Sequence, residues 1–401
     1  MTDSDVEELS VSPSAPSGQA KFFLGFDFGT THSGIAYAFE NCPEDLEVIQ
    51  EWPEGGNNSS QKVPTLISFR GDTALWGYMV NEMKPCIRGF KLLLDKSKNL
   101  SYGPAIESEA IIQSLDKKPV DIAGIYLKKL MSHARTILCR RGIESVLDTM
   151  DVQYIVTVPA VWSDKAKDLT MQAARLAGIP QANLVLLSEP EAAAVDAIRT
   201  IQPNSITQDD CFIVCDAGGG TVDLITYKVT QKDPLRLEEV TEGTGAICGS
   251  TILDNAFQKL LIETISKTHY DQLSDEAKRI PMRIWEKDIK PNYAGQDLED
   301  ADADDFLDAG YIIPVPGVPD CPEKHIRNGM LYFESEQVEK IFRPVVEQIK
   351  SLISDQVLGA KLAGIPPKAV ILVGGLGSSE YVFKALKTCF TGMEVMQPRN
   401  A

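Results

Sequence analysis

Two aspartates, each followed by a glycine–threonine turn, are the residues of this chain whose types and spacing point most clearly to chemistry. Asp27 follows an apolar run in the segment FFLGFDFGTT at 22–31, and Asp216 follows another in FIVCDAGGGTVD at 212–223. Glycines lack a Cβ, so backbone N–H groups in such turns can wrap an anion, and the threonine hydroxyls add donors. An aspartate beside a polyphosphate is suited to holding Mg²⁺ through its water shell. The pair therefore predicts two facing lobes that bind one phosphate chain.

A third glycine element strengthens this interpretation. One glycine turn alone is usually an ordinary hairpin, and a buried aspartate at a strand end can simply cap a turn. The third element is AVILVGGLGSS at 369–379, an apolar strand pattern that runs into glycines and then into an amphipathic helix from about 379 to 389. Such a turn admits a flat base or a ribose against bare backbone.

The elements that must position these residues follow from hydrophobic periodicity and capping signals. Each of the first two turns is expected to join two strands, with the second strands at 34–39 and 222–229. The pattern also predicts strands at 154–158 and 184–187 and helices at 121–141, at 165–177, from 190 onward and at 337–358. We expect the last of these helices to cross between the lobes.

Composition limits the class of protein. A chain of 401 residues with 43% hydrophobic content can bury two substantial cores, and its length suggests two or three domains. The formal net charge of -18 argues against nucleic acid or an anionic membrane as a partner, because phosphate backbones need clustered lysine and arginine. No apolar run approaches the ~20 residues of a membrane span. The acidic, Ser/Pro-rich residues 1–20 are predicted to be a disordered leader.

The cysteines and histidines offer no metal or disulfide framework. The 8 cysteines are scattered without CxxC pairs, a pattern typical of buried, reduced thiols in a cytoplasmic protein. The 4 histidines are isolated from one another, so no zinc site can be assembled from them.

With its three glycine elements in this order, the chain resembles the superfamily of actin, hexokinase and the heat-shock ATPases, and within it the ATPase domain of the heat shock protein 70 family. Four stretches carry the likeness: LGFDFGTTHS at 24–33, VPAVWSD at 158–164, SEPEAAA at 188–194, and 216–223 together with VGG at 373–375. The likeness spans about 21–395, specific at the motifs and loose between them, which indicates a divergent relative of fungal type. It implies an α/β, actin-like ATPase fold with two duplicated ribonuclease-H-like lobes around a nucleotide cleft, and ATP or ADP with Mg²⁺ as cofactors.

The resemblance also implies a domain plan. Lobe I would cover 21–205 with an outer subdomain at about 52–118, and lobe II would cover 206–401 with an outer subdomain at about 249–325. The acidic run at 297–308 is interpreted as a solvated loop. Against the family pattern, lobe II is expected to be incomplete at its C-terminal end and a peptide-binding domain to be missing. Cochaperones or nucleotide exchange factors are the implied partners, with client peptides only if such a domain exists.

Roles for single residues are likewise implied by the resemblance. Asp27 and Asp216 would hold the waters of Mg²⁺, and Lys91 and Glu189 would orient the attacking water. Asp223 would support either the second turn or a second water. The phosphate donors would be Gly29, Thr30, Thr31, Gly218, Gly219, Gly220 and Thr221. The base and ribose would be held by Gly374, Gly375, Ser378, Glu286 and Lys290. Two alternatives stay open: Lys91 could be a surface lysine, and Glu286 with Lys290 could be a plain i,i+4 surface ion pair.

Three classes of function remain. The first is a heat-shock-type ATPase with slow turnover, because phosphoryl transfer to water needs chiefly placement and charge neutralisation. The second is a small-molecule kinase of the same superfamily, which would need an additional substrate base in the cleft. The third is a scaffold that binds nucleotide without turnover.

Overall fold

The computed structural model describes residues 21–56, 60–95, 102–143, 149–201, 205–295 and 310–398. The predicted leader at 1–20 and the acidic run at 297–308 lie outside these residues. Within the described ranges, no helix combines the length and the apolar character needed to cross a membrane.

The first half of the chain is built on a mixed sheet with the strand order β3-β2-β1-β8-β9. Its strands are β1 (Lys21–Asp27), β2 (His32–Phe39), β3 (Cys42–Val48), β8 (Asp151–Val158) and β9 (Leu184–Ser188), and the short β4 (Val63–Pro64) pairs with β2. Strand β1 runs antiparallel to β2 and parallel to β8, which is parallel to β9. Phe22, Leu24 and Phe26 on alternate positions of β1 are buried, as expected for a strand with one face on a core.

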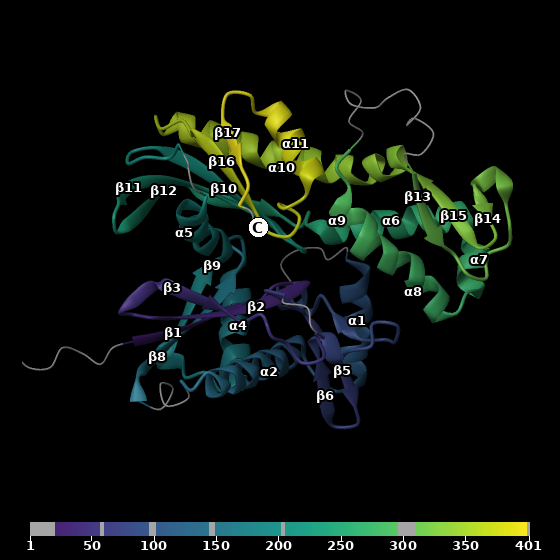
Figure 1. Cartoon of the computed structure of the whole chain (residues 1–401), viewed down its shortest axis with the longest axis horizontal. Helices are drawn as coiled ribbons and strands as arrows, with labels where there is room; N and C mark the ends of the chain where they lie inside the picture. Colours follow the sequence, from purple (N-terminus) through teal and green to yellow (C-terminus); the bar gives the residue numbers. More distant parts are fainter. Residues whose placement is uncertain are drawn as a thin grey trace, which may run out of the picture.

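The second half repeats this plan. Its sheet has the order β12-β11-β10-β16-β17, formed by β10 (Cys211–Ala217), β11 (Val222–Lys232), β12 (Leu235–Ala246), β16 (Ala369–Val373) and β17 (Glu394–Met396). Strand β10 is antiparallel to β11 and parallel to β16, and β16 is parallel to β17, so every central pairing has the same sense as in the first sheet. The predicted duplicated α/β architecture is confirmed, and the two sheets lie in opposite halves of Figure 1.

Helices cover the second sheet on both faces, which explains why β10 and β16 are almost wholly apolar. On one face packs α5 (Glu189–Thr200), whose Ala194, Ala197 and Ile198 are buried against strands of this sheet. Because α5 follows directly on β9 of the first sheet, it joins the two halves. The other face is covered by α10 (Ser335–Leu362).

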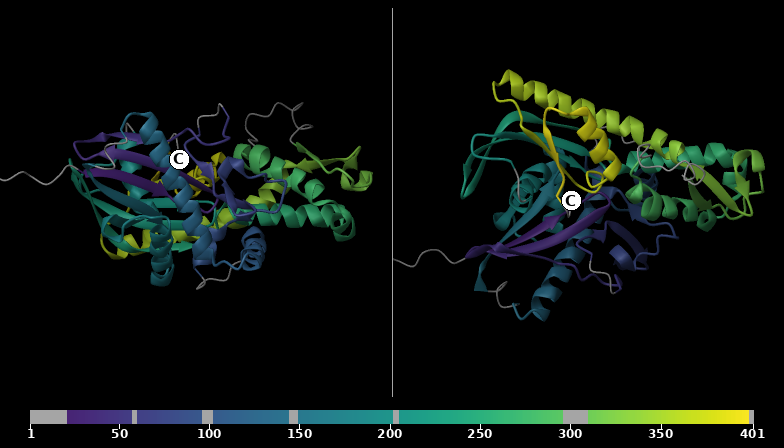
Figure 2. Two further views of the ribbon diagram at one scale, coloured as in Figure 1. Left: turned by 90° about the horizontal axis from the view of Figure 1, so that it is seen from below. Right: turned by 45° about the horizontal axis from the view of Figure 1, so that its top comes forward.

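The expectation that the long helix at 337–358 crosses between the lobes is wrong. α10 contacts β10, β11, β12 and β15, together with α6 and α11, all of which come from the second half. Gln356 fixes it there, because its Oε1 accepts a hydrogen bond from Thr226 Oγ1 at 2.6 Å and its Nε2 donates one to the Glu242 carbonyl at 3.0 Å. Figure 2 shows α10 lying along the second half of the molecule.

The remaining elements form the outer parts of each half and the helices behind the first sheet. In the first half these are β5 (Leu66–Arg70), β6 (Thr73–Trp76), β7 (Ile87–Arg88), α1 (Gly103–Ser114), α2 (Pro119–Arg140) and α4 (Asp164–Leu176), with 3₁₀ helices at Gly77–Met79, Phe90–Leu94 and Gln181–Asn183. In the second half they are α6 (Ser250–Ile265), α7 (Lys267–Gln272), α8 (Asp275–Ile284), a π-helix at Trp285–Ile289, α9 (Lys290–Asn292), β13 (Gly310–Pro314), a 3₁₀ helix at Pro322–Lys324, β14 (Ile326–Arg327), β15 (Met330–Glu334) and α11 (Glu380–Cys389).

The cysteines are free thiols, but the expectation that they are buried holds for only part of the set. Buried thiols are those of Cys86, Cys211, Cys215 and Cys248, whereas Cys42, Cys139 and Cys389 are exposed and Cys321 is intermediate. Exposed thiols occur at the end of α2 and in α11, outside the cores.

Candidate functional site

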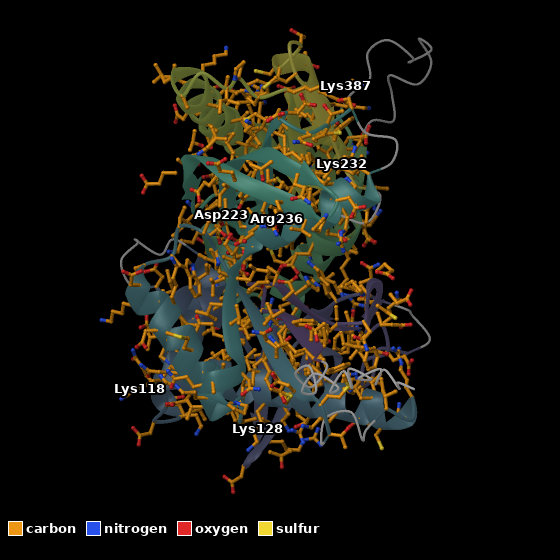
Figure 3. All side chains as sticks on the ribbon, turned by 90° about the vertical axis from the view of Figure 1, so that its left-hand side faces the viewer. Lys118, Lys128, Asp223, Lys232, Arg236 and Lys387 are labelled. Atoms are coloured by element: carbon orange, nitrogen blue, oxygen red, sulfur yellow. The ribbon has the colours of Figure 1, made fainter. Side chains whose placement is uncertain are left out.

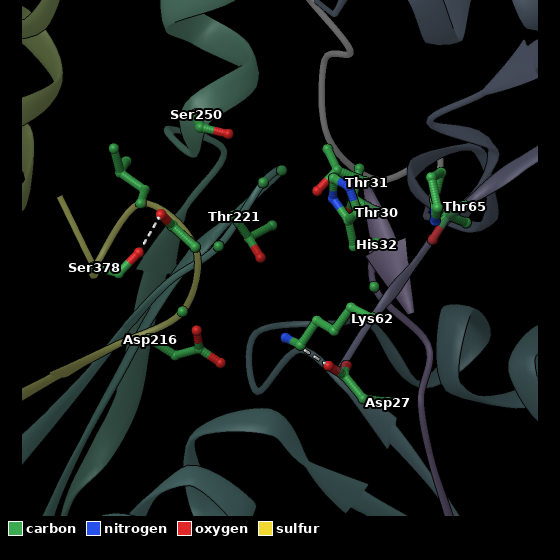
Figure 4. A pocket seen from close by; sticks show the side chains of 18 of the residues that line it. Asp27, Thr30, Thr31, His32, Lys62, Thr65, Asp216, Thr221, Ser250 and Ser378 are labelled. Atoms are coloured by element: carbon green, nitrogen blue, oxygen red, sulfur yellow. Dashed lines mark hydrogen bonds and ion pairs between the residues drawn. The ribbon is translucent and has the colours of Figure 1, made fainter. Parts of the chain in front are cut away.

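A cavity of about 1140 Å³ is lined from both halves of the chain. It brings together all but one of the residues predicted to form a site: Asp27, Gly29, Thr30, Thr31, Lys91, Glu189, Asp216, Gly218, Gly219, Gly220, Thr221, Glu286, Lys290, Gly374, Gly375 and Ser378. Figure 4 shows the first turn and Asp27 on one side of this cavity and Asp216, Thr221, Ser250 and Ser378 on the other. Residues far apart in the sequence thus form one site because the two halves face each other.

The two glycine–threonine turns approach each other at one end of the cavity. A Cβ added to Gly219 would lie 2.6 Å from Thr31 Oγ1, and one added to Gly220 would lie 2.8 Å from Thr30 Oγ1. Only glycine therefore allows this separation of the turns. The threonine hydroxyls of the first turn lie directly against the backbone of the second.

The second turn is held from behind by the start of α6. The carbonyls of Gly218, Gly219 and Gly220 accept hydrogen bonds from the backbone N–H groups of Ser250 at 3.1 Å, Thr251 at 2.9 Å and Gly249 at 3.2 Å. These bonds tie the carbonyls of the turn to the helix and so fix its backbone. A fixed backbone is what an anion-binding turn requires.

Asp216 lies beside the third glycine turn. Gly374 has a φ of +86°, a left-handed conformation that favours glycine, and a side chain there would collide with the Asp216 carboxylate. Leu376 and Gly377 donate backbone hydrogen bonds to the Ala217 carbonyl at 2.8 and 3.0 Å, which joins this turn to the end of β10. Burial, together with the charges of Glu189, Asp223 and Asp27, raises the pKa of Asp216 to about 8.

Asp27 has a cationic partner that the sequence did not reveal. Lys62 Nζ lies 2.9 Å from Asp27 Oδ2, and Thr157 Oγ1 donates a hydrogen bond to Asp27 Oδ1 at 3.3 Å. Burial acts to raise the pKa of Asp27, but the charge and hydrogen bond of Lys62 outweigh it and hold that pKa below its usual value. Lys62 directly precedes β4, and the pairing of β4 with β2 brings Lys62 close to Asp27. Because this pairing joins segments that are distant in the sequence, no local pattern indicated the contact.

Lys91 is buried and pairs with Glu189, so the alternative that it is a surface lysine is wrong. Its side chain is 2% exposed, and Nζ contacts the Glu189 carboxylate and lies 5.7 Å from the ring centroid of Phe28 and 5.3 Å from that of Trp162. Burial raises the pKa of Glu189 to about 7, although the charge of Lys91 acts in the opposite direction. The pair lines the cavity between the two sheets.

Glu286 and Lys290 both line the cavity, but they do not form the i,i+4 ion pair considered from the sequence. Residues Trp285–Ile289 form a π-helix, and Lys290 Nζ instead lies 2.7 Å from Asp254 Oδ1 on α6. The same Asp254 oxygen accepts a hydrogen bond from Trp285 Nε1 at 2.9 Å. Burial raises the pKa of Glu286 to about 7, and the charge of Asp254 contributes to the rise.

Changing Glu286 to glutamine is expected to stabilise the protein above neutral pH. The pKa of Glu286 is about 7 in the folded protein and 4.5 in its unperturbed state, so ionisation opposes folding increasingly from pH 4.5 and fully above pH 7. E286Q removes this cost, and we expect about 1–3 kcal/mol at pH 8 and no gain near pH 4.5. Denaturant unfolding at both pH values measures it. The exposed E336Q variant on α10 is the control, and an equal gain for both variants at pH 8 would contradict the assignment.

Asp223 is the predicted site residue that does not line the cavity. It is buried on β11, and its Oδ1 accepts a hydrogen bond from the backbone N–H of Val161 at 3.2 Å. Val161 belongs to the loop after β8, so the bond connects the second half to the first. In Figure 3, Asp223 is labelled in the middle of the molecule, where the two halves meet.

The donor set of the cavity suits a magnesium ion that is shared with a ligand. Among the described residues, no group of three His, Cys, Asp or Glu side chains is arranged to hold a metal alone. Mg²⁺ usually keeps several waters and is bound by one or two carboxylates together with substrate phosphates. Asp27 and Asp216, on opposite sides of the cavity, are carboxylates of that kind.

The duplicated sheets and the cavity between them define the class: this is an actin-like ATPase fold with two lobes. The sequence profile of the family described as Hsp70 protein matches residues 23–290. The chain therefore belongs to the Hsp70 family.

Individual relatives are distant. Heat shock 70 kDa protein 12A of Homo sapiens is 24% identical over 481 residues, an alignment that covers 97% of this chain and 67% of that protein. The mouse protein of the same name is 23% identical, with 92% of this chain and 65% of the relative covered. A Chaperone protein HscA homolog of Acinetobacter baumannii is 26% identical over 387 residues, with 93% and 54% covered. The chain thus spans about two thirds of the length of the 12A proteins and about half that of the HscA homolog.

Proposed function

We propose that this chain binds ATP and ADP with Mg²⁺ in the cavity between its lobes and hydrolyses ATP slowly, as the nucleotide-binding domain of a chaperone of the Hsp70 type. The observation that carries the proposal is the convergence of three glycine turns on one cavity lined from both halves. Membership of the Hsp70 family supports the same ligand. The names of the relatives, a heat shock protein and a chaperone, support the chaperone role.

In this proposal each part of the cavity has a distinct task. Mg²⁺, when bound, supplies charge neutralisation at the phosphates, and Asp27 and Asp216 hold its water shell. The backbone at 218–221 and the hydroxyls of Thr30 and Thr31 donate hydrogen bonds to the phosphate oxygens. The turn at 374–378 holds the base and ribose together with Glu286 and Lys290, which line the same cavity.

Glu189 and Lys91 act on the hydrolytic step. Glu189 accepts a hydrogen bond from the attacking water and orients it, while Lys91 offsets charge on the γ-phosphate. Phosphoryl transfer to water depends mainly on placement and charge neutralisation and not on a strong base, so we infer slow turnover. The helix α5 carries Glu189 and packs against the second sheet, so lobe movement can couple nucleotide state to cochaperones or nucleotide exchange factors.

Changing Glu189 to glutamine is expected to reduce ATP hydrolysis by about 10²-fold or more while nucleotide affinity changes little, because the amide orients water less well and cannot accept its proton. Single-turnover phosphate release measures the rate, and calorimetry with ADP measures the affinity. Equal turnover in E189Q and wild type would remove Glu189 from the hydrolytic step.

The proposed function is tested by incubating the purified chain with ATP and Mg²⁺, alone and with a panel of sugars and short carboxylic acids. Phosphate release without an acceptor supports the ATPase. Phosphorylation of an acceptor would instead identify a small-molecule kinase. Nucleotide-induced melting shifts without turnover would identify a scaffold, since a bound ligand raises stability by RT ln(1 + [L]/Kd).

A further inference from the structure

Lys62 lines the cavity, and neither the sequence nor the family resemblance assigned it a role. Its Nζ lies 2.9 Å from Asp27 Oδ2. Figure 4 shows the side chain extending from the first half into the cavity, with its amine between Asp27 and Asp216. The amine therefore occupies the space between the two carboxylates proposed to hold the waters of Mg²⁺.

The backbone around Lys62 is firmly positioned. The Lys62 carbonyl accepts hydrogen bonds from Ser60 Oγ at 2.7 Å and from Tyr78 OH at 3.2 Å. The next residues form β4, in which Val63 pairs with Ser33 and Pro64 with His32, directly after the first glycine–threonine turn. The Thr65 N–H also donates to the Thr31 carbonyl at 2.8 Å. This register fixes the Lys62 backbone beside the first turn.

The carboxylates that line the cavity favour a cation between Asp27 and Asp216. Three carboxylates, those of Asp27, Glu189 and Asp216, line the region where a polyphosphate would add further negative charge. Lys91 already has Glu189 as its partner and is 2% exposed, so a change of partner would be difficult for it. The Lys62 side chain is 49% exposed, so its amine is more accessible to an entering anion than that of Lys91.

We propose that Lys62 is a phosphate-binding residue, which moves from Asp27 to the terminal phosphates when nucleotide enters and so allows nucleotide to be held without Mg²⁺. This inference rests on the proposed function of the cavity. The movement releases Asp27 for the water shell of the metal when Mg²⁺ is present. When Mg²⁺ is absent, the amine supplies part of the positive charge that the phosphates need.

The test compares nucleotide affinity with Mg²⁺ and with EDTA in wild type, K62M and K62R. Methionine keeps the length of the side chain without its charge, and arginine keeps the charge. Isothermal titration calorimetry with ADP is the readout, and K340M, at an exposed ion pair on α10, is the matched control. We expect wild type, K62R and K340M to lose no more than about tenfold in affinity on chelation, and K62M to lose about a hundredfold, the value of a charged hydrogen bond. Circular dichroism melting of K62M without nucleotide checks that it folds.

The outcomes separate this inference from the function on which it rests. The role of Lys62 is supported if wild type and K62R bind ADP in EDTA and K62M does not. If wild type binds ADP with Mg²⁺ and K62M has the same affinity as wild type both with Mg²⁺ and with EDTA, the role of Lys62 is overturned and the proposed function stays intact. Wild-type binding that vanishes in EDTA also overturns the role of Lys62. A wild-type chain that binds no nucleotide in either buffer overturns the proposed function and this inference together.

Discussion

Replacing Asp216 with asparagine is expected to lower the affinity for ADP in Mg²⁺ by about a hundredfold or more, because a neutral amide cannot hold the water shell of the ion as a carboxylate does. The same change should make the nucleotide-free protein harder to melt. Burial, and then the charges of Glu189 and Asp27, raise the pKa of Asp216, so the ionised carboxylate lowers the stability of the nucleotide-free protein until a cation binds. If D216N binds ADP more weakly and is also more stable, the Asp216 carboxylate serves ligand binding and does not stabilise the fold.

Calorimetry with ADP and thermal melting of the nucleotide-free protein test the two halves of this expectation. D320N, at an exposed aspartate, serves as the control that should change neither quantity. D27N should also lose Mg²⁺-dependent affinity, but without the gain in melting temperature, because it removes the partner of Lys62. Unchanged ADP binding in D216N would refute the ligand-binding role given to Asp216. A lower melting temperature of D216N would show that the Asp216 carboxylate stabilises the fold.

The site was predictable from sequence where its residues are positioned by local structure. Asp27 and Asp216 each end a strand that turns directly into glycines, so a single segment contains the carboxylate, the turn and the returning strand. The cap of α4 was predictable for the same reason, since Ser163 Oγ accepts a hydrogen bond from the Ala166 N–H three residues later. Repetition of the local pattern was enough to predict two facing lobes.

Residues positioned by pairing between distant segments were missed or misplaced. Lys62 reaches Asp27 through the pairing of β4 with β2, and nothing in its own segment indicates this. Lys290 was interpreted with its neighbour Glu286, whereas its partner Asp254 lies on α6, 36 residues earlier. The amphipathic pattern of α10 predicted a helix with one buried face, but not which lobe that face would cover.

Changing Gly219 to valine is expected to abolish nucleotide binding. A Cβ at this position would lie 2.6 Å from Thr31 Oγ1 and 2.7 Å from Thr31 Cγ2, and valine adds two methyl groups beyond it. The second turn cannot shift away, because the Gly219 carbonyl is bonded to the Thr251 N–H at the start of α6. The lobes must therefore separate at the phosphate end of the cavity, and donors from opposite turns can no longer contact one ligand.

The loss of affinity for ADP in G219V should exceed about a hundredfold, since several charged hydrogen bonds are broken together. G392V is the matched control, because a side chain at Gly392 meets nothing within 4 Å. Small-angle scattering distinguishes the mechanism from simple unfolding, as separated lobes enlarge the molecule while circular dichroism stays unchanged. In G219V the two glycine–threonine turns would be too far apart to bind the same phosphate chain. If G219V nevertheless binds ADP with the affinity of wild type, the two turns do not share a phosphate chain in the wild-type protein either.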